Sequence, residues 1–356
     1  MKTRLTDLLG VRHPIVQTGM GWVAGPRLAA STSNAGGLGI LASATMNIAE
    51  LRAAVTEMKD KTPHVFGVNL RTDSPDIDER VELLISERVK VASFAMAPRA
   101  DLVARLRDGG VIVIPSIGAK RHAEKVAEMG VDAVLVQGGE GGGHTGSVPT
   151  TLLLPQVVDA VDVPVIAAGG FFDGRGLVAA LAYGADGIAM GTRFLLTKES
   201  TVPDSVKEFY LSQTVFDTLV TMKVDGFPHR VLRTTFVDEL ERAGRVRTLL
   251  RALRNAWAYK RYANARWTDM LREGLAMRRN YELSFGQMLM AANTPMLLRA
   301  AMVEGNLDFG VMASGQVVGV IDDLPTVAEV IERIVKEAEA VLGRLTPVTR
   351  SRSAPS

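Results

Sequence analysis

The stretch PVIAAGGFFDGRGLVAALAYGADGIAMGTRF, residues 164–194, contains two short apolar runs with a helix-like segment between them. The runs PVIAAGG (164–170) and GIAMGTRF (187–194) are rich in apolar residues and end in small or polar ones. Such runs are typical of parallel strands that are buried on both faces. The segment GRGLVAALAYGA (174–185) supplies the connecting helix. The stretch therefore predicts two parallel strands joined by a helix.

The same alternation occurs throughout the preceding part of the chain. Six further apolar runs occupy residues 14–20, 38–44, 66–70, 91–96, 111–117 and 133–139. Eight such units predict the α/β class and a (β/α)₈ TIM barrel that closes by about residue 194. An open doubly wound sheet is the alternative, but it needs a glycine fingerprint between a strand and a helix. The formal match, GGLGILA (36–42), is itself half strand, so we favour the barrel.

After the eighth strand, the alternation of apolar runs and helix-like segments ends. The next hundred or so residues contain three helix-like segments, at 205–220, 249–275 and 284–305. We expect a barrel at 1–199, a helical insertion at 200–309 that covers the barrel mouth, and a return to the barrel with a terminal helix at 310–345. The Pro- and Ser-rich tail, residues 346–356, is predicted to be disordered.

The composition limits the class of protein. The chain has 356 residues, of which 47% are hydrophobic, and a net charge of +2, so a large core is expected and no overall field favours nucleic acid. Because cysteine is absent, there is no disulfide framework and no thiolate ligand or nucleophile. The N-terminus lacks a signal-like apolar region, and no apolar stretch approaches the roughly 20 residues that span a bilayer. We expect a cytoplasmic protein that binds neither nucleic acid nor membrane.

The active site of such a barrel lies at the carboxyl ends of the strands, which here carry small, amide or hydroxyl groups. Asn69 and Gln137 can each donate and accept hydrogen bonds, as the edge of an isoalloxazine or nicotinamide ring requires. The ends AAGGF (167–171) and MGTRF (190–194) expose backbone N–H groups where barrels commonly bind phosphate. These ends lack Asp, Glu and His at metal-ligand spacing, so we predict no metal site.

The sixth strand is followed by the glycine-rich run VQGGEGGGHTG, residues 136–146. Glycine lets the backbone approach a ligand closely, although its conformational freedom makes such a run costly to order. His144 lies near the end of the run, and imidazole exchanges a proton near neutral pH, so we predict that His144 is the catalytic acid/base. Glu140 is the second candidate, and the alternative role for its carboxylate is to fix the loop by hydrogen bonds.

Several stretches together resemble the nitronate monooxygenase (2-nitropropane dioxygenase-like) family. They are residues 16–43, FGVNL (66–70), the run 136–146, residues 164–200 and ANTPM (292–296). The resemblance implies an FMN-dependent barrel, in a family that also includes enoyl-thioester reductases. It is strongest to actinobacterial members that dehydrogenate bicyclic CoA thioesters in steroid (cholesterol) degradation. This implies dehydrogenation or reduction at the Cα–Cβ bond of an acyl-CoA, with NAD(H) as the electron partner.

The resemblance also implies which residues bind FMN and which face the substrate. His144 is the family's base, on the substrate side of the ring. The residues implied to contact FMN are Met20, Gly21, Asn69, Gln137, Gly142, Gly143, Gly169, Gly170, Met190, Gly191 and Thr192. The family usually reads E-A-G-G-H-R-G at the histidine, whereas this chain has Gly141 in place of Ala and Thr145 in place of Arg. This departure counts against a nitronate substrate but not against the flavin.

A basic, aromatic segment at 242–267 contains no Asp or Glu. Arg247, Arg251 and Arg254 share one helix face, and we expect them to bind the phosphates of CoA. A solvated face or an interface between copies in a homo-oligomer are the alternatives. His229, in VDGFPHRVLRT (224–234), either contacts substrate or packs a turn.

Three functional hypotheses stay open from the sequence. The first is a flavin-dependent dehydrogenase or reductase of an acyl-CoA thioester. The second is oxidation of alkyl nitronates with O₂ on the same fold. The third is a non-catalytic barrel that binds flavin without turnover.

Overall fold

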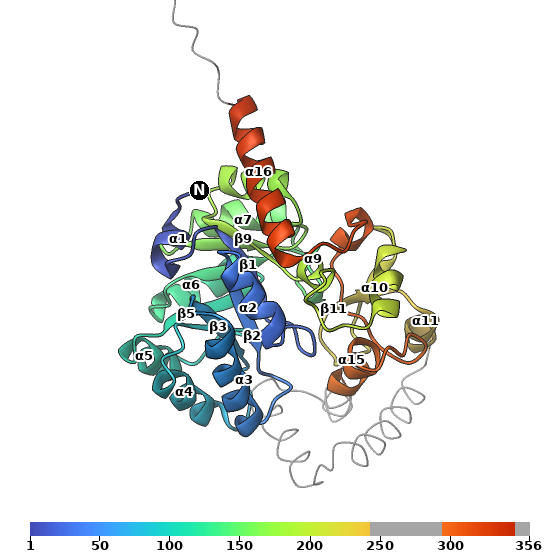
Figure 1. Cartoon of the computed structure of the whole chain (residues 1–356), viewed down its shortest axis with the longest axis horizontal. Helices are drawn as coiled ribbons and strands as arrows, with labels where there is room; N and C mark the ends of the chain where they lie inside the picture. Colours follow the sequence, from blue (N-terminus) through green and yellow to red (C-terminus); the bar gives the residue numbers. More distant parts are fainter. Residues whose placement is uncertain (243–293, 346–356) are drawn as a thin grey trace, which may run out of the picture.

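The structure is a computed structural model that describes residues 1–242 and 294–345. Eight parallel strands follow one another around a closed barrel, and the last strand pairs with the first (Figure 1). The strands are β1 (Ile15–Gln17), β2 (Leu38–Ala42), β3 (Phe66–Leu70), β4 (Val91–Phe94), β5 (Ile112–Ile117), β6 (Val134–Gln137), β8 (Val165–Ala168) and β9 (Gly187–Met190). Each lies within one of the eight predicted runs, so the predicted (β/α)₈ barrel is confirmed.

The helices that connect the strands form the outer layer (Figure 1). They are α2 (Pro26–Asn34), α3 (Ile48–Lys61), α4 (Ile77–Ser86), α5 (Ala100–Asp108), α6 (Lys120–Glu128), α7 (Thr150–Val158) and α8 (Gly174–Ala182). Local sequence fixes where some of them begin. Asn47 and Glu50 form a capping box at the start of α3, and Asp173 accepts a hydrogen bond from the Gly176 N–H at the start of α8.

The eighth helical position is filled from the far end of the chain. Helix α16 (Val327–Leu345) packs against α8 and α2, as expected for the helix that follows β9. The segment between β9 and α16 is therefore an insertion into the last strand–helix unit. The predicted division into a barrel at 1–199, an insertion at 200–309 and a return at 310–345 stays a prediction.

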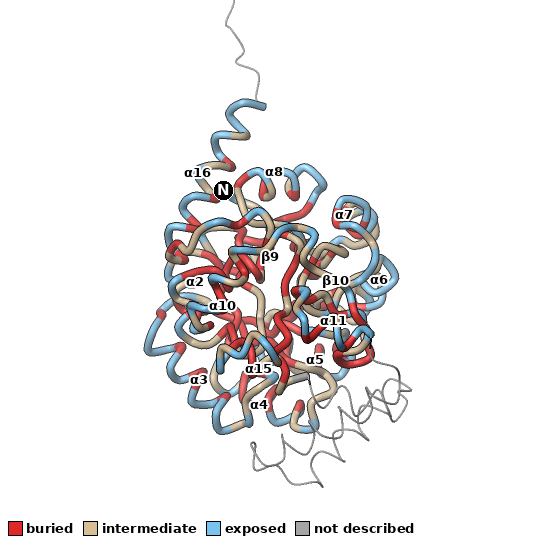
Figure 2. Tube along the Cα trace, turned by 90° about the vertical axis from the view of Figure 1, so that its right-hand side faces the viewer, coloured by how far each residue is buried: buried red, intermediate tan, exposed pale blue. Residues whose placement is uncertain are grey.

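The barrel interior is filled by aliphatic side chains from alternate strand positions. The buried cluster contains Val16, Leu38, Ile40, Val91, Ile114, Leu135 and Ile166. Helix α1 (Arg4–Leu9) adds Leu5 and Leu9 to this cluster at the amino ends of the strands. Figure 2 shows the same division, with buried residues along the strands and exposed ones on the outer helices. Because α1 packs against the amino end of the barrel, we expect ligands to enter from the carboxyl end.

The inserted segment is less helical than we predict from the sequence. It contains α9 (Thr192–Leu195), α10 (Asp204–Leu211), α11 (Thr235–Arg242), α15 (Thr294–Met302) and a 3₁₀ helix, η1 (Gln316–Val320). It also contains the antiparallel strands β10 (Thr218–Thr221) and β11 (His229–Leu232). The predicted helix at 205–220 is wrong beyond Leu211, where Thr and Val residues favour a strand. The predicted helix at 249–275 and the disordered tail lie outside the described residues.

Within the two described ranges, no helix has both the length and the apolar character that a bilayer span requires.

Candidate functional site

The interior of the barrel changes from aliphatic to polar at the carboxyl ends of neighbouring strands. Asn69 on β3 lies opposite Ser93 on β4, and the Asn69 side-chain amide donates a hydrogen bond of 2.9 Å to the Ser93 hydroxyl. Ser43, which follows β2, donates from its hydroxyl to the Asn69 backbone carbonyl at 2.6 Å. The bond to Ser93 orients the Asn69 side chain, and the bond from Ser43 holds its backbone, at the strand end where the sequence predicts a ring-binding amide.

The loop after β1 approaches this layer closely. A Cβ atom on Gly19 would lie 2.4 Å from the Cβ atom of Asn69, so only glycine fits there. Trp22, beyond the predicted flavin-flanking residues Met20 and Gly21, has a φ of 64°. Its indole Nε1–H donates to the Pro295 carbonyl at 2.9 Å, which connects this loop to the inserted segment. A positive φ at a bulky residue is strained and is found mostly at functional sites.

The ends of β8 and β9 have the backbone expected of a phosphate cradle. Gly169 and Gly170 have φ values of +97° and +83°, which favour glycine. Gly191 follows Met190, the last residue of β9. The hydroxyl of Thr192 accepts a 3.1 Å hydrogen bond from the Gly315 N–H, so the chain that returns from the insertion reaches this strand end.

The glycine-rich loop after β6 is held from both sides. The Gln137 side-chain amide donates to the carbonyls of Gly142 and His144, at 3.3 and 2.8 Å. A Cβ atom on Gly142 would lie 2.5 Å from the backbone nitrogen of Gly315, so this glycine permits close backbone approach. Gly143 has a φ of +71°. The predicted flavin contacts at this loop thus also build the loop.

Glu140 forms hydrogen bonds at the start of α7. Its carboxylate accepts hydrogen bonds from the Thr150 backbone N–H at 3.0 Å and from the Thr150 hydroxyl at 2.7 Å. An anion at the first turn of a helix is stabilised by the exposed N–H groups. These hydrogen bonds connect the glycine-rich loop to α7, and the catalytic role of Glu140 stays a prediction.

The inserted segment places a strand directly against His144. Gly143 and His144 form the short strand β7, which pairs with β11 in a three-stranded antiparallel sheet ordered β10-β11-β7. In this pairing His229 lies opposite His144, and Arg230 lies opposite Gly143. Side chains of directly opposite residues are neighbours on one face of a sheet. His229 therefore begins a strand, β11, rather than packing a turn, which was one of its two expected roles.

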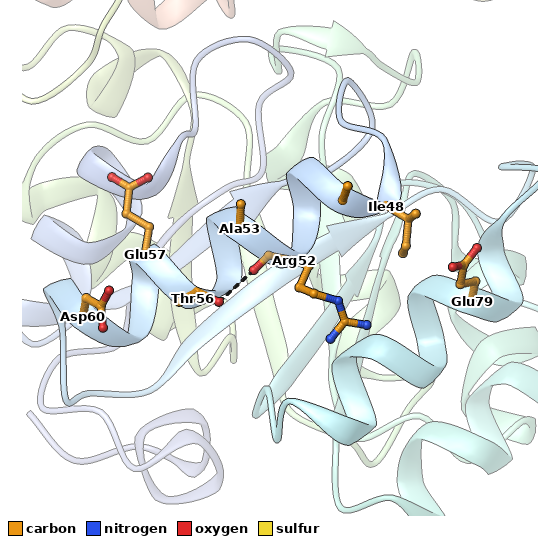
Figure 3. Close-up of a pocket in the computed structure, with 8 residues that line it drawn as sticks. Ile48, Arg52, Ala53, Thr56, Glu57, Asp60 and Glu79 are labelled. Carbon is orange, nitrogen blue, oxygen red and sulfur yellow. Dashed lines mark hydrogen bonds between the residues drawn. The ribbon is translucent and has the colours of Figure 1, made fainter.

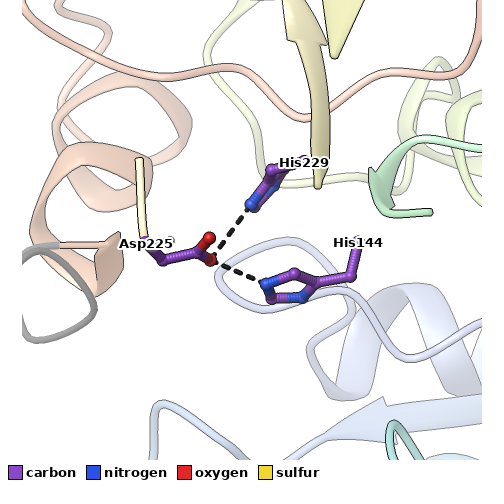
Figure 4. Close-up of side chains that lie close together, drawn as sticks. All are labelled: His144, Asp225 and His229. Atoms are coloured by element: carbon purple, nitrogen blue, oxygen red, sulfur yellow. Dashed lines mark hydrogen bonds and ion pairs between the residues drawn. The ribbon is translucent and has the colours of Figure 1, made fainter. Parts of the chain in front are cut away.

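His144 and His229 share one carboxylate, that of Asp225 (Figure 4). The Asp225 Oδ2 atom lies 2.7 Å from His144 Nε2 and 3.3 Å from His229 Nδ1. The two imidazole ring centres are 4.7 Å apart. The side chain of His144 is 60% exposed, whereas those of Asp225 and His229 are 5% and 4% exposed. Only His144 thus has a face open to a ligand.

Burial and hydrogen bonding act on the cluster in different directions. Burial alone would raise the pKa of Asp225, but hydrogen bonds from His144 and His229 hold that pKa well below its usual value. Burial lowers the pKa of His229, and the adjacent Asp225 only partly offsets this effect. At neutral pH the cluster therefore contains an ionised carboxylate beside a neutral His229.

Asp225 is the residue that the sequence analysis missed. An acid four positions before His229 in VDGFPHRVLRT is a visible signal, but strand pairing is needed to bring it to His144. The three potential ligand atoms lie within 4.8 Å of one another, a spacing that is compatible with a metal ion. The absence of a metal site therefore remains a prediction, based on strand ends alone.

Other parts of the chain are less closely connected with this site. Arg247, Arg251 and Arg254 lie outside the described residues. A surface pocket runs along the outer face of α3 (Figure 3). Its lining includes Arg52, Thr56, Glu57 and Glu79 and none of the predicted site residues.

Comparisons with known proteins agree with the geometry. A family model described as nitronate monooxygenase matches residues 2–80 and 75–337. A Rhodococcus jostii protein named (3aS,4S,5R,7aS)-5-hydroxy-7a-methyl-1-oxo-octahydro-1H-indene-4-carboxyl-CoA dehydrogenase is 62% identical over 95% of this chain and 96% of its own. A Mycobacterium tuberculosis protein of the same name is 61% identical, with the same coverage. The solved structure of FabK from Thermotoga maritima has a TM-score of 0.79 and 37% identity, over 97% of this chain and 98% of its own.

Proposed function

Because the chain belongs to the nitronate monooxygenase family, we propose that it is the flavin-dependent member that dehydrogenates a bicyclic, steroid-derived acyl-CoA thioester. The observation that carries this proposal is the identity of 62% and 61%, over 95% of the chain, to two dehydrogenases of an indene carboxyl-CoA. We infer that the bond oxidised is Cα–Cβ of the thioester, where a base and a hydride acceptor act on adjacent carbons.

The described strand ends fit FMN. A mononucleotide needs one phosphate cradle, and Gly169, Gly170 and Gly191 offer backbone without side chains at two adjacent strand ends. Among the described residues, none donates a hydrogen bond to the amide oxygen of Asn69, so this oxygen is available to a ring edge. A second nucleotide would need the fingerprint that is missing between strand and helix. When bound, FMN supplies the two-electron acceptor that takes the hydride from Cβ.

The chain's own residues supply the proton transfer and the positioning. His144 removes the proton from Cα, and the exposed face of its ring leaves room for the substrate. Glu140 keeps the glycine-rich loop against α7. Trp22 and its bond to the Pro295 carbonyl hold the opposite wall of the barrel mouth. Loss of the Cα proton and of the Cβ hydride leaves the Cα=Cβ double bond in the product.

An anaerobic half-reaction tests this function. The flavin-loaded protein is mixed with the bicyclic acyl-CoA, and we expect the flavin absorbance to bleach with formation of the enoyl-CoA, as seen by mass spectrometry. Reoxidation is then compared between NAD⁺ and O₂, and we expect NAD⁺ to be the better acceptor. Fast bleaching by a nitroalkane anion but not by the thioester would support nitronate oxidation instead. Flavin that bleaches with neither would support the non-catalytic barrel.

We further propose that Arg247, Arg251 and Arg254 bind the phosphates of CoA. Reversal of all three to Glu is expected to raise KM for the full CoA thioester by roughly tenfold or more, because phosphate pairing is binding energy remote from the reaction. KM for a truncated thioester without the nucleotide is the control and should change little. An equal loss with both substrates would assign this segment to folding or to an oligomer interface.

A further inference from the structure

The two hydrogen bonds to Asp225 indicate which ring nitrogen of His144 and of His229 carries a hydrogen atom. An ionised carboxylate can only accept, so each ring nitrogen that contacts it must carry the hydrogen. Asp225 Oδ2 contacts Nε2 of His144 and Nδ1 of His229. A neutral imidazole carries one hydrogen, so the other nitrogen of each ring has a free lone pair. The geometry therefore determines the tautomer of both histidines.

We propose that Asp225 is a positioning residue that fixes His144 as the Nε2–H tautomer and so makes Nδ1 the atom that exchanges the proton with the substrate. This inference rests on the proposed role of His144 as the acid/base group. Among the described residues, none forms a hydrogen bond with His144 Nδ1, and the side chain is exposed. Proton removal from Cα converts His144 to imidazolium, which the adjacent Asp225 carboxylate stabilises.

Asp225 is itself held in place. Its Oδ1 atom accepts a 3.1 Å hydrogen bond from the Phe227 N–H, and His229 holds Oδ2 from the other side. The Nε2 atom of His229 is buried and has no partner among the described residues. A buried acceptor without a partner destabilises the fold, so stability alone does not account for a histidine here. The hydrogen bond that His229 Nδ1–H donates to Asp225 does account for a histidine at this position.

The groups that face Asp225 are few in the described part of the chain. His144 on β7 and His229 on β11 are the titratable groups that act on its carboxylate. His229 stays neutral because burial lowers its pKa. The negative charge of Asp225 therefore stabilises one protonated imidazole, that of His144. The proton that His144 receives can leave through its exposed side.

The tautomer is measurable without any turnover. Long-range proton–nitrogen correlation spectra of protein carrying isotope-labelled histidine distinguish Nε2–H from Nδ1–H, and the chain has only five histidines. His144→Gln identifies the signal. For the neutral ring of His144 we expect the Nε2–H tautomer, and in Asp225→Asn a mixture of tautomers. A signal of the Nδ1–H tautomer in the unmodified chain would overturn the inference and leave the proposed reaction intact.

Kinetics provide the second test. Asp225→Asn keeps the shape of the side chain but removes its charge, and we expect kcat to fall by roughly 10²–10⁴-fold with little change in KM. Asp308→Asn, at an exposed position of the insertion, is the matched control. A normal kcat in Asp225→Asn would contradict the positioning role.

A pair of substitutions at His229 separates hydrogen bonding from packing. His229→Asn places an N–H group near the position of Nδ1, whereas His229→Leu fills the space without a donor. We expect Asn to exceed Leu in kcat by about tenfold, while both retain flavin. Equal activities would mean that His229 does not act through its bond to Asp225. If the tautomer of His144 is as inferred but His144→Ala is fully active, the proposed function of His144 fails instead.

Discussion

His144 combines two properties at the scale of a single residue. One ring nitrogen is hydrogen-bonded to a buried acid, and the rest of the ring faces outward with 60% of the side chain exposed. A general base needs both fixed orientation and access to the substrate. Glu140, the other titratable group of the glycine-rich loop, has orientation but is occupied by Thr150.

Replacing His144 with Ala is expected to lower kcat by roughly 10²–10⁴-fold, the range for loss of a positioned general base. The flavin should stay bound, because the proposed FMN contacts do not include the imidazole of His144. Stopped-flow bleaching by the acyl-CoA measures the effect directly. Glu140→Gln is the companion variant, and a large loss there with near-normal His144→Ala would exchange the two roles.

The buried His229 predicts a pH dependence of folding. Burial lowers its pKa below the ordinary value of 6.5, so below pH 6.5 the unfolded chain binds a proton that the folded chain does not. The free energy of unfolding should therefore fall as pH decreases from 6.5, by at most about 1.4 kcal/mol per pH unit from this residue.

Urea unfolding at pH 7.5 and 5.5 checks this dependence. The difference between the two conditions should shrink in His229→Gln and persist in His122→Gln, at an exposed position of α6. Persistence of the full difference in His229→Gln would show that other groups cause it.

At the scale of elements, strand ends and a strand pairing make the site together. The ends of β8 and β9 offer bare backbone, whereas β11 of the insertion supplies the pairing that orients His144. The eight barrel strands were predictable because apolar runs buried on both faces are visible in the sequence. Strands β10 and β11 were not, since two short strands beside a helix give too little periodicity to identify. Asp225 depends on that pairing and was missed with it.

Gly191→Asp is expected to abolish flavin retention. A Cβ atom at Gly191 would lie 3.4 Å from Met20 Sδ and from the Thr18 hydroxyl, which is ordinary contact, so the variant should fold. Its carboxylate would then lie beside the proposed phosphate and repel it. Absorbance after desalting measures the bound flavin. Gly191→Asn introduces a side chain of the same size without the charge. This variant should retain more flavin than Gly191→Asp. Equal loss of flavin in the two variants would point to steric exclusion.

At the scale of the whole molecule, α16 completes the ring of helices from the end of the chain. Gly174, the first residue of α8, allows this docking, because a Cβ atom there would lie 2.4 Å from the Ala338 backbone nitrogen. The Gly174 N–H also donates to the Glu337 carboxylate at 2.9 Å. The terminal helix was predicted from its amphipathic pattern, but its partners follow only from the closed barrel.

Gly174→Ala should lower the free energy of unfolding by about 1–3 kcal/mol, since it forces two backbones apart. Gly343→Ala is the matched control on the same interface helix, because a Cβ atom there would meet nothing within 4 Å. Alanine is the better helix former, so that variant should be stabilised by up to about 1 kcal/mol. Chemical denaturation measures the free energy of unfolding of both variants. Equal changes in this free energy would contradict tight docking at Gly174.

The pairing of β7 with β11 also sets an order of events during synthesis. All eight barrel strands have been made once Met190 is added, but Asp225 lies a further 35 residues along the chain. At roughly 5–20 residues per second, the ribosome needs several more seconds to deliver it. A nascent chain can thus align its barrel strands while His144 still lacks its partner. If His144 is the acid/base group as proposed, chemical competence would be acquired late in the life of the growing chain, after the strands proposed to bind the cofactor are in place.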